Sequence, residues 1–460
     1  MTAVQARRCC RAVIATRLVR RAMKVAAACA LVAAIPLAAA GEPSAADALS
    51  VHRIVVAFAD RPEPAPAAGS TPRGYDGLPS YAGSQRANHA AARIAHDYGL
   101  REVSAWTIEP LQLRCMLFEL PLQADRDDML ARLRRDARVQ LAQPLQEFST
   151  YAGDAHIGAP ATAPPAAAAV AFNDPYFGLQ HGFAAIDAGS AQRWSDGSGI
   201  RVAIVDTGVD AAHPDLAGRI VVQRDFVTDR PDARAGNRHG TEVAGVIVAV
   251  ANNGLGIVGV APGTRILSYR ACWPVRADDG AARCDTFTLA QALGAAIASG
   301  APLINLSLGG PADPLLEQLL AFALAHGRIV VGALPPGGRT DGFPVDVAGV
   351  VAVGSAGDPL PAGSAALAAP GRDILTLEPG GHYDYASGSS LAAAHVTGAI
   401  ALLLGLDRHL AARSAWSLLE ASRGGAGATI DACKAVQALG HAQGTCTAVA
   451  ARPEPGRATR

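Results

Sequence analysis

The sequence predicts an α/β protein whose doubly wound, mostly parallel sheet is flanked by helices and preceded by a smaller α+β domain. Three observations support this prediction. From residue 173 to about 440, continuous apolar runs alternate with helical stretches, which is typical of a parallel sheet covered on both faces. Residues 49–151 show the order β-α-β-β-α-β of a ferredoxin-like fold. Between them, residues 152–172 form an Ala/Pro-rich linker, which is expected to be accessible to proteases.

Composition restricts the class of protein before any motif is considered. The 460 residues include 40 basic and 40 acidic side chains, so the formal net charge is zero and nothing favours nucleic acid or an anionic membrane surface as partner. Hydrophobic residues make up 50% of the chain, enough for a large core, which excludes wholesale disorder. We expect a monomer without an organic cofactor.

The first 40 residues have the features of a signal peptide. Positive charges precede an apolar run, Val25 to Ala39, and small residues follow it. The run is shorter than the roughly 20 residues of a membrane span, so no membrane insertion of the mature protein is expected. Met23 is an alternative start, and a buried helix is the alternative interpretation. The prediction is export to the periplasm or the medium, with residues 441–460 as a C-terminal tail.

Periodicity and residue type place the individual elements. In the smaller domain, strands are expected at 51–58, 103–108, 113–120 and 139–142, and helices at 87–98 and 125–135. In the larger domain, strands are expected at 201–205, 265–269, 303–306, 329–331 and 350–353, and helices at 240–250, 289–299, 315–326, 390–404 and 415–422. Functional residues of such a sheet should gather at the carboxyl ends of its strands.

Four cysteines lie in the larger domain or its tail: Cys272, Cys284, Cys433 and Cys446. They allow three disulfide connectivities, of which the nearest-neighbour pairing, Cys272–Cys284 with Cys433–Cys446, closes two short loops. Each bond would stabilise the protein by roughly 3 kcal/mol in the loop-entropy model. Four reduced thiols are the alternative, and the spacings match no zinc site.

Three short motifs contain the residue types of nucleophilic catalysis. Asp206 begins an Asp-Thr-Gly sequence at the end of a predicted strand, His239 begins a helix, and Ser390 begins another. A serine nucleophile needs a base within hydrogen-bond reach, and that base needs a carboxylate to orient it. An aspartic protease built on Asp206 would need a second such motif, and none occurs in the sequence.

The motifs together resemble those of the subtilisin-like serine proteases (subtilases). Asp-Thr-Gly, His-Gly-Thr-Glu-Val-Ala-Gly and Gly-Ser-Ser-Leu-Ala-Ala-Ala-His-Val-Thr-Gly occur in the family's order, and the likeness covers about residues 173–425. It implies a subtilisin-like fold and a serine endopeptidase that acts through an acyl-enzyme intermediate. Ser390 would be the nucleophile, His239 the general base and Asp206 its orienting carboxylate. The preceding domain would be an inhibitory propeptide, removed by self-processing in the linker.

The resemblance also implies a substrate-binding segment. Ser307, Leu308 and Gly309 lie in the sequence Ile-Asn-Leu-Ser-Leu-Gly-Gly, which is similar to the family segment that pairs with the backbone of a polypeptide substrate. An extended substrate would add there as a strand. A turn at the end of a strand, without substrate contact, is the alternative.

A calcium site is implied by further matches to the family. Residues 173–177 resemble the mature start of thermitase-like subtilases, and residues 251–257 resemble the family's calcium loop. By family position, Asp174, Asp215 and Asn253 would be side-chain ligands, and oxygen donors of this kind suit calcium. The alternative is a metal-free loop held by turn hydrogen bonds.

The sequence departs from the family pattern at two positions. Subtilases carry an Asn that donates to the oxyanion, and Pro336, which has no N–H, falls near its place. In subtilisin, loss of that donor lowers turnover by about 10²–10³-fold, so a slow protease or a peptide-binding pseudoprotease is the alternative function. Glu242 replaces a common second His and is expected to raise the pKa of His239.

Overall fold

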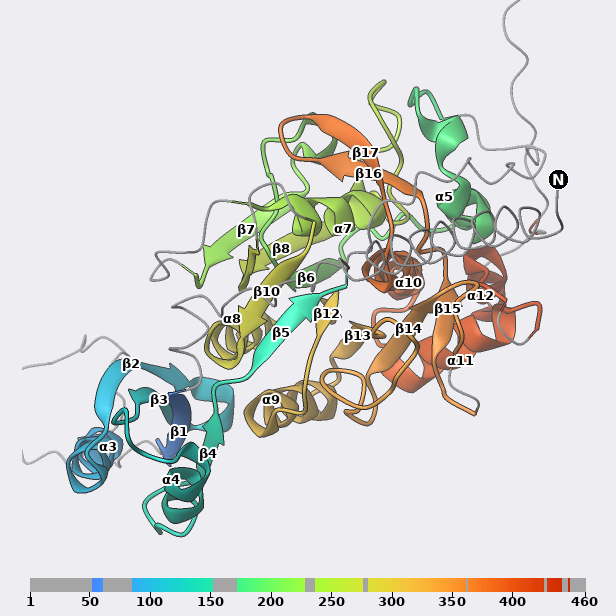
Figure 1. Cartoon of the computed structure of the whole chain (residues 1–460). Coiled ribbons are helices and arrows are strands. Elements are labelled where there is room, and N and C mark those ends of the chain that lie inside the picture. The colour runs from blue at the N-terminus through green and yellow to red at the C-terminus, as the bar shows by residue number, and fades with distance from the viewer. Residues whose placement is uncertain are drawn as a thin grey trace, which may run out of the picture. The chain divides into compact units, whose positions relative to one another are not determined.

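The structure is a computed structural model that describes residues 52–60, 85–151, 172–227, 236–275, 280–360, 363–425, 428–440 and 446 (Figure 1). The predicted signal peptide, nearly all of the predicted linker and, apart from Cys446, the predicted C-terminal tail lie outside these residues. The chain divides into residues 1–50 and a compact unit from Val51 onward, and the latter is described below.

The first domain is an antiparallel sheet with two helices. Its strands are β1 (Arg53–Ala59), β2 (Arg101–Ile108), β3 (Leu113–Glu119) and β4 (Leu141–Pro144), and its helices are α3 (Gln85–Tyr98) and α4 (Arg126–Leu133). The strand order β2-β3-β1-β4 is that of the predicted ferredoxin-like fold. Helix α3 presents Ala87, Ala91 and Ile94, spaced three to four residues apart, to a core shared with β1.

The last strand of this domain lies two residues later than predicted. Val139 donates its N–H to the Asp136 carbonyl at 2.9 Å and so belongs to a turn. Arg138 reinforces that turn because its guanidinium donates to both carboxylate oxygens of Asp136. Local polar contacts of this kind compete with strand formation, and apolar periodicity does not report them.

The larger domain is built on the predicted doubly wound parallel sheet. Its strands are β6 (Arg201–Asp206), β7 (Ile220–Asp225), β8 (Arg265–Arg270), β11 (Leu303–Leu306), β13 (Ile329–Ala333), β14 (Val351–Ser355) and β15 (Leu367–Ala369). Their order is β15-β14-β13-β11-β6-β8-β7, and every pair is parallel. Strands β7 and β15 were not predicted, because one is a largely exposed edge strand and the other has only three residues.

Helices cover both faces of this sheet (Figure 1). Alternate residues of β6 point to opposite cores: Val202 and Ile204 join one, Ala203 and Val205 the other. The first core contains α7 (Arg238–Val248), α10 (Ser389–Leu406), α11 (Ala412–Ser422) and α12 (Ala432–Ala438); the second contains α8 (Thr286–Ala298) and α9 (Pro314–Ala325). Among the described residues, α10 alone is long and apolar enough to cross a membrane, and 89% of its apolar window is buried in the protein.

Shorter elements complete both domains. The first domain has η1 (Glu109–Leu111). The larger domain has η2 (Phe177–Leu179), α5 (His181–Ala185), α6 (Ala188–Ala191), η3 (Pro214–Leu216) and the hairpin β16 (Ile374–Glu378) with β17 (His382–Ala386). Phe172 makes a tilted ring contact with Phe177 and an edge-to-face contact with Phe183, so its side chain packs on this domain. Both nearest-neighbour disulfides are present, which confirms that pairing.

A second, antiparallel sheet joins the two domains. Its order is β12 (Leu308–Gly309), β5 (Glu147–Thr150), β10 (Ala282–Asp285) and β9 (Cys272–Pro274). Strand β5 follows the ferredoxin-like sheet in the chain, yet it pairs on both sides with strands of the larger domain. The sequence did not predict β5, β9 or β10, because short strands whose partners are distant in sequence leave little local pattern.

Two helical glycines provide a stability prediction. A Cβ at position 398 in α10 would lie 2.5 Å from the Val260 Cβ, whereas one at position 294 in α8 would meet nothing within 4 Å. Gly398→Ala should therefore destabilise the protein by about 1–3 kcal/mol through overpacking. Gly294→Ala should stabilise it by about 0.5–1 kcal/mol through helix propensity. Chemical denaturation of both variants measures the difference, and equal midpoints would contradict the close approach of α10.

Candidate active site

Three predicted site residues come together at the carboxyl edge of the parallel sheet. Asp206 is the last residue of β6, and His239 and Ser390 are each the second residue of a helix, α7 and α10. All three are at most 1% exposed. From β6 the chain continues to strands on one side of the sheet, and from β11 to strands on the other side. In parallel sheets a crevice forms at the carboxyl ends of the two strands where the order changes direction in this way.

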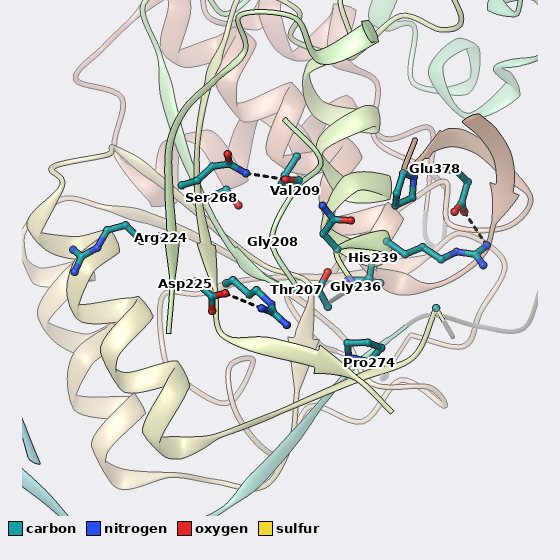
Figure 2. Close-up of a pocket in the computed structure, with 16 residues that line it drawn as sticks. Thr207, Gly208, Val209, Arg224, Asp225, Gly236, His239, Ser268, Pro274 and Glu378 are labelled. Carbon is teal, nitrogen blue, oxygen red and sulfur yellow. Dashed lines mark hydrogen bonds and ion pairs between the residues drawn. The ribbon is translucent and has the colours of Figure 1, made fainter. Parts of the chain in front are cut away.

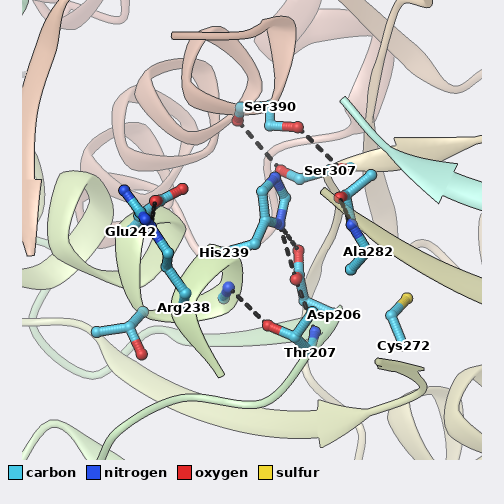
Figure 3. A network of polar contacts seen from close by, with 12 residues as sticks. Asp206, Thr207, Arg238, His239, Glu242, Cys272, Ala282, Ser307 and Ser390 are labelled. Atoms are coloured by element: carbon cyan, nitrogen blue, oxygen red, sulfur yellow. Dashed lines mark hydrogen bonds and ion pairs between the residues drawn. The ribbon is translucent and has the colours of Figure 1, made fainter. Parts of the chain in front are cut away.

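Asp206 and His239 form a buried pair. The His239 Nδ1 lies 2.8 and 2.9 Å from the two carboxylate oxygens of Asp206 (Figure 3). A short contact sets this geometry: Gly240 donates its N–H to Thr207 Oγ1 at 3.0 Å. Only glycine fits there, since a Cβ at position 240 would lie 2.0 Å from the Gly208 carbonyl oxygen. The carboxylate thus fixes one ring nitrogen and directs the other toward the crevice.

Ser390 is close to this pair but bonded elsewhere. Its hydroxyl donates to the Ser307 carbonyl at 2.9 Å, and the Ser307 hydroxyl lies 3.1 Å from the Ser390 carbonyl (Figure 3). The His239 Nε2 is buried and has no hydrogen-bond partner among the described residues. The imidazole is therefore oriented for proton transfer while the hydroxyl still contacts the strand end after β11.

Charged groups beside His239 shift its pKa. Burial disfavours the imidazolium, but the charge of Asp206, its hydrogen bond to the ring and the charge of Glu242 together raise the pKa of His239 above its ordinary value. Glu242 is 2% exposed and accepts a hydrogen bond from Arg238 Nε at 2.9 Å. The sequence-based expectation for Glu242 therefore has the correct sign.

Arg238 and Glu378 are parts of this site that the sequence did not reveal. Arg238 also lies 2.8 Å from Glu378, which comes from the end of β16. Burial, followed by the charge of Glu242, raises the pKa of the Glu378 carboxyl well above its usual range. No local motif signals Glu378, because the β16–β17 hairpin brings it to α7 from far along the chain.

A cavity of about 660 Å³ opens beside His239 (Figure 2). Thr207 and Gly208 line it from the end of β6, and Arg238 and Glu378 face it from α7 and β16. Its other charged lining includes Arg270, which is paired with Asp225 at 2.7 Å. The cavity has both polar and charged lining residues and adjoins the buried imidazole of His239.

A second cavity, of about 200 Å³, lies on the other side of the serine. Gly388 and Ser389, which precede Ser390, line it together with Tyr151 and Pro336. Pro336 therefore lies close to the nucleophile position, as its place in the sequence implied. The Ser389 hydroxyl donates to the Leu334 carbonyl at 2.5 Å on the same wall.

The predicted calcium residues also gather in one place. Asp174 and Asp215 are 4% and 0% exposed, and Asn253 donates to Asp215 Oδ1 at 2.7 Å. Burial, together with the nearby charge of Asp174, raises the pKa of Asp215. The Asp174 Oδ1 is buried without a hydrogen-bond partner among the described residues. Two buried carboxyl groups with an unpaired oxygen fit a divalent cation, and a rotated Asn253 amide would add another oxygen.

A carboxylate-held imidazole beside a serine at a helix start, placed at the carboxyl edge of a parallel sheet, is the apparatus of a serine hydrolase. The profile of the Subtilase family matches residues 197–428, which is half of the chain. The chain therefore belongs to the subtilase family and is a serine-type endopeptidase.

Individual relatives agree with this assignment. The chain is 37% identical to thermitase of Thermoactinomyces vulgaris over 246 residues, which cover 51% of this chain and 86% of thermitase. It is 39% identical over 221 residues to the thermophilic serine proteinase of Bacillus sp. (strain AK1), covering 46% of this chain and 54% of that protein. The structure of fervidolysin from Fervidobacterium pennivorans covers 84% of this chain and 61% of its own, with a TM-score of 0.62 and 22% identity, and supports the fold.

The charge of Glu242 leads to a pH prediction. A general base works only when neutral, so a raised His239 pKa moves the acidic limb of kcat/KM to higher pH. Glu242→Gln removes one of the raising charges and should shift that limb to lower pH. The pH–rate profile of the mature enzyme measures this, with Glu420→Gln on α11 as the remote control. A limb that stays in place in Glu242→Gln would contradict the role of Glu242.

Proposed function

We propose that the chain is an exported, self-processing subtilase in which Ser390 is the nucleophile, His239 the general base and Asp206 the orienting carboxylate. In the reaction, the Ser390 hydroxyl attacks the scissile carbonyl carbon and His239 Nε2 takes its proton. His239 then returns the proton to the leaving amine, and water hydrolyses the acyl-enzyme by the same route. The 2.8 Å contact between His239 and Asp206 supports these roles.

The observation that supports self-processing best is the position of β5. It lies antiparallel to β12 and β10, with Thr150 opposite Leu308 and Ser149 opposite Arg283. An extended polypeptide substrate would add a strand between β12 and β10 in this way. Residues 147–151 therefore occupy the groove as a substrate-like segment of the same chain, and residues 49–151 act as an inhibitory propeptide.

Side-chain fit defines the register of that segment. Glycines 309 and 310 leave room for it: a Cβ at Gly309 would lie 2.4 Å from the Tyr151 hydroxyl oxygen, and one at Gly310 would lie 2.6 Å from a ring carbon of Phe148. Phe148 is 1% exposed and makes an edge-to-face contact with Phe343. Burial raises the pKa of Tyr151 to about 12, so its phenol stays neutral in the cavity beside Ser389. The scissile bond is accordingly the one that follows Tyr151.

The hydroxyl of Ser390 must change partner before it can react. In the occupied groove it donates to Ser307, and the His239 Nε2 is left unpaired. Rotation of the Ser390 side chain about one bond exchanges the carbonyl acceptor for the imidazole. This one rotation would complete the triad without movement of the backbone.

Stabilisation of the oxyanion is the weakest part of the proposed mechanism. The backbone N–H of Ser390 at the start of α10 supplies one donor, and the helix dipole favours negative charge there. Pro335 and Pro336, which line the same cavity, have no N–H to offer. We therefore propose slower turnover than in relatives with the usual Asn, and a peptide-binding pseudoprotease is the alternative that the processing experiment tests.

A structural calcium ion is part of the proposal. Asp174, Asp215 and Asn253 would hold it, together with backbone oxygens of the 251–257 loop. The ion would neutralise two buried carboxyl groups that otherwise repel each other. It would supply stability to the loop between α7 and β8 and no chemistry to the peptide bond.

Export is supported by the leader-like sequence and by two disulfides. Disulfides form and persist in oxidising compartments such as the periplasm and the extracellular medium. The proposed location of the mature enzyme is one of these two.

Expression with the native leader tests processing and export together. Intact masses from the periplasmic and medium fractions should show wild type cleaved between Tyr151 and Ala152. Ser390→Ala should lose only its leader, because the nucleophile is absent, and Ser198→Ala should process like wild type as an exposed control.

Two outcomes would change the proposal. A wild type that stays uncleaved in these fractions, with and without calcium, would favour the pseudoprotease. A cut that depends on Ser390 but lies elsewhere in the linker would show that β5 does not occupy the groove in the register given above.

Calcium removal tests the proposed metal site. In the Ser390→Ala background, which prevents autolysis, a chelator should lower Tm by about 5 °C, since calcium at 100 Kd contributes about 2.7 kcal/mol. Asp215→Asn should abolish the difference between calcium and chelator, and Asp127→Asn, an exposed site on α4, should retain it. A wild-type-like calcium response in Asp215→Asn would exclude this site.

A further inference from the structure

The disulfide between Cys272 and Cys284 lies at the edge of the substrate groove. The two cysteines face each other as cross-strand partners in β9 and β10, and both are fully buried. The bond therefore joins the two strands at the base of their hairpin. Cys433 and Cys446, in contrast, lie at α12 and beyond, far from the groove in the sheet topology.

Strand β10 forms one wall of that groove. Cys284 itself is the register partner of Phe148, and Arg283 is the partner of Ser149. The Ala282 N–H also donates to Thr150 Oγ1 at 3.0 Å (Figure 3). A bound peptide would therefore pair with β10 at its third to fifth residues before the scissile bond, and a threonine at the second residue would add a side-chain contact.

The wall loses support when the groove is empty. In the described part of the chain, β10 has two sheet neighbours, β5 and β9, and β5 departs with the propeptide. What remains is a ribbon of β10 with the three residues of β9, which packs on the core beside α8 but has no strand on its groove side. A covalent bond between its strands compensates for the missing neighbour.

The disulfide also connects this wall to the catalytic strand. Cys272 follows Ala271, whose N–H donates to the backbone carbonyl of Asp206 at 2.8 Å. Figure 3 shows Cys272 and Ala282 beside the Asp206–Thr207 segment. At the other strand, Asp285 caps α8 by accepting the Thr288 N–H at 2.9 Å. The disulfide thus joins β9, which is held by the hydrogen bond of Ala271 to Asp206, to β10, which is held by the cap of Asp285 on α8.

We propose that the Cys272–Cys284 disulfide is a positioning element for extended substrates, which holds β10 in the geometry that pairs with the third to fifth residues before the scissile bond. The inference rests on the proposed function, because the path of β5 is taken as the path of a substrate. It assigns the bond a role in substrate affinity in addition to any effect on stability.

The test compares an extended with a short substrate. Mature wild type, Cys272→Ala/Cys284→Ala and the control Cys433→Ala/Cys446→Ala are assayed on a Phe-Ser-Thr-Tyr anilide and on a blocked tyrosine ester that ends at the first residue. Loss of the groove disulfide should raise KM for the tetrapeptide about tenfold, the equivalent of one or two net hydrogen bonds. The kcat and KM for the ester should stay within twofold of wild type, and the control pair should leave both substrates unaffected.

Several results would overturn the inference. The inference fails if the KM for the tetrapeptide is unchanged. It also fails if kcat/KM falls equally on both substrates, or if the control pair shows the same rise in KM. Each of these results would show that the bond acts on stability alone. If the alanine pair does not fold, Cys272→Val/Cys284→Ala restores part of the buried volume. It is assayed in the same way, by the change in KM for the tetrapeptide relative to that for the ester. A wild type that is inactive on both substrates would instead refute the proposed function, and this inference with it.

Discussion

The close packing of α7 and α10 on one face of the parallel sheet is the constraint on which the site depends. Both helices start at the carboxyl edge, so their first turns place His239 and Ser390 beside the end of β6. Glycines let each helix approach the loops beside it, since a Cβ at Gly240 would lie 2.0 Å from the Gly208 carbonyl oxygen and one at Gly398 would lie 2.5 Å from the Val260 Cβ. The hydrophobic core and the site therefore share the same helices, and neither can be altered without the other.

Burial makes the charges of the site depend on one another. An imidazole that is 1% exposed would lose its affinity for a proton without a partner, and Asp206 supplies that partner at 2.8 Å. Glu242, on α7 like His239, adds a second carboxylate. Arg238 forms ion pairs with both Glu242 and Glu378, which lies at the end of β16. The environment of the general base therefore depends on the β16–β17 hairpin as well as on the family motifs.

Under the proposed function, β5 occupies the substrate groove, and this would explain several features of the structure. Strand β5 fills the space between β12 and β10, Tyr151 enters the cavity beside Ser389, and Ser390 donates to Ser307. A substrate-like segment from the same chain gives the closest view of how a peptide would lie. Under the same proposal, β10 is the wall that would lose a neighbouring strand on removal of that segment.

The sequence by itself determined the class of fold, the order of the two domains and the residues of the carboxyl-edge motifs. It could do so because apolar periodicity and short motifs such as those at Asp206, His239 and Ser390 are local properties of the chain. Only the tertiary structure decided that β5 pairs between β12 and β10, that Arg238 joins Glu242 to Glu378, and that Ser390 is hydrogen-bonded to Ser307. Each of these depends on residues far apart in the chain, whose approach is set by packing and long-range pairing and leaves no local pattern to read.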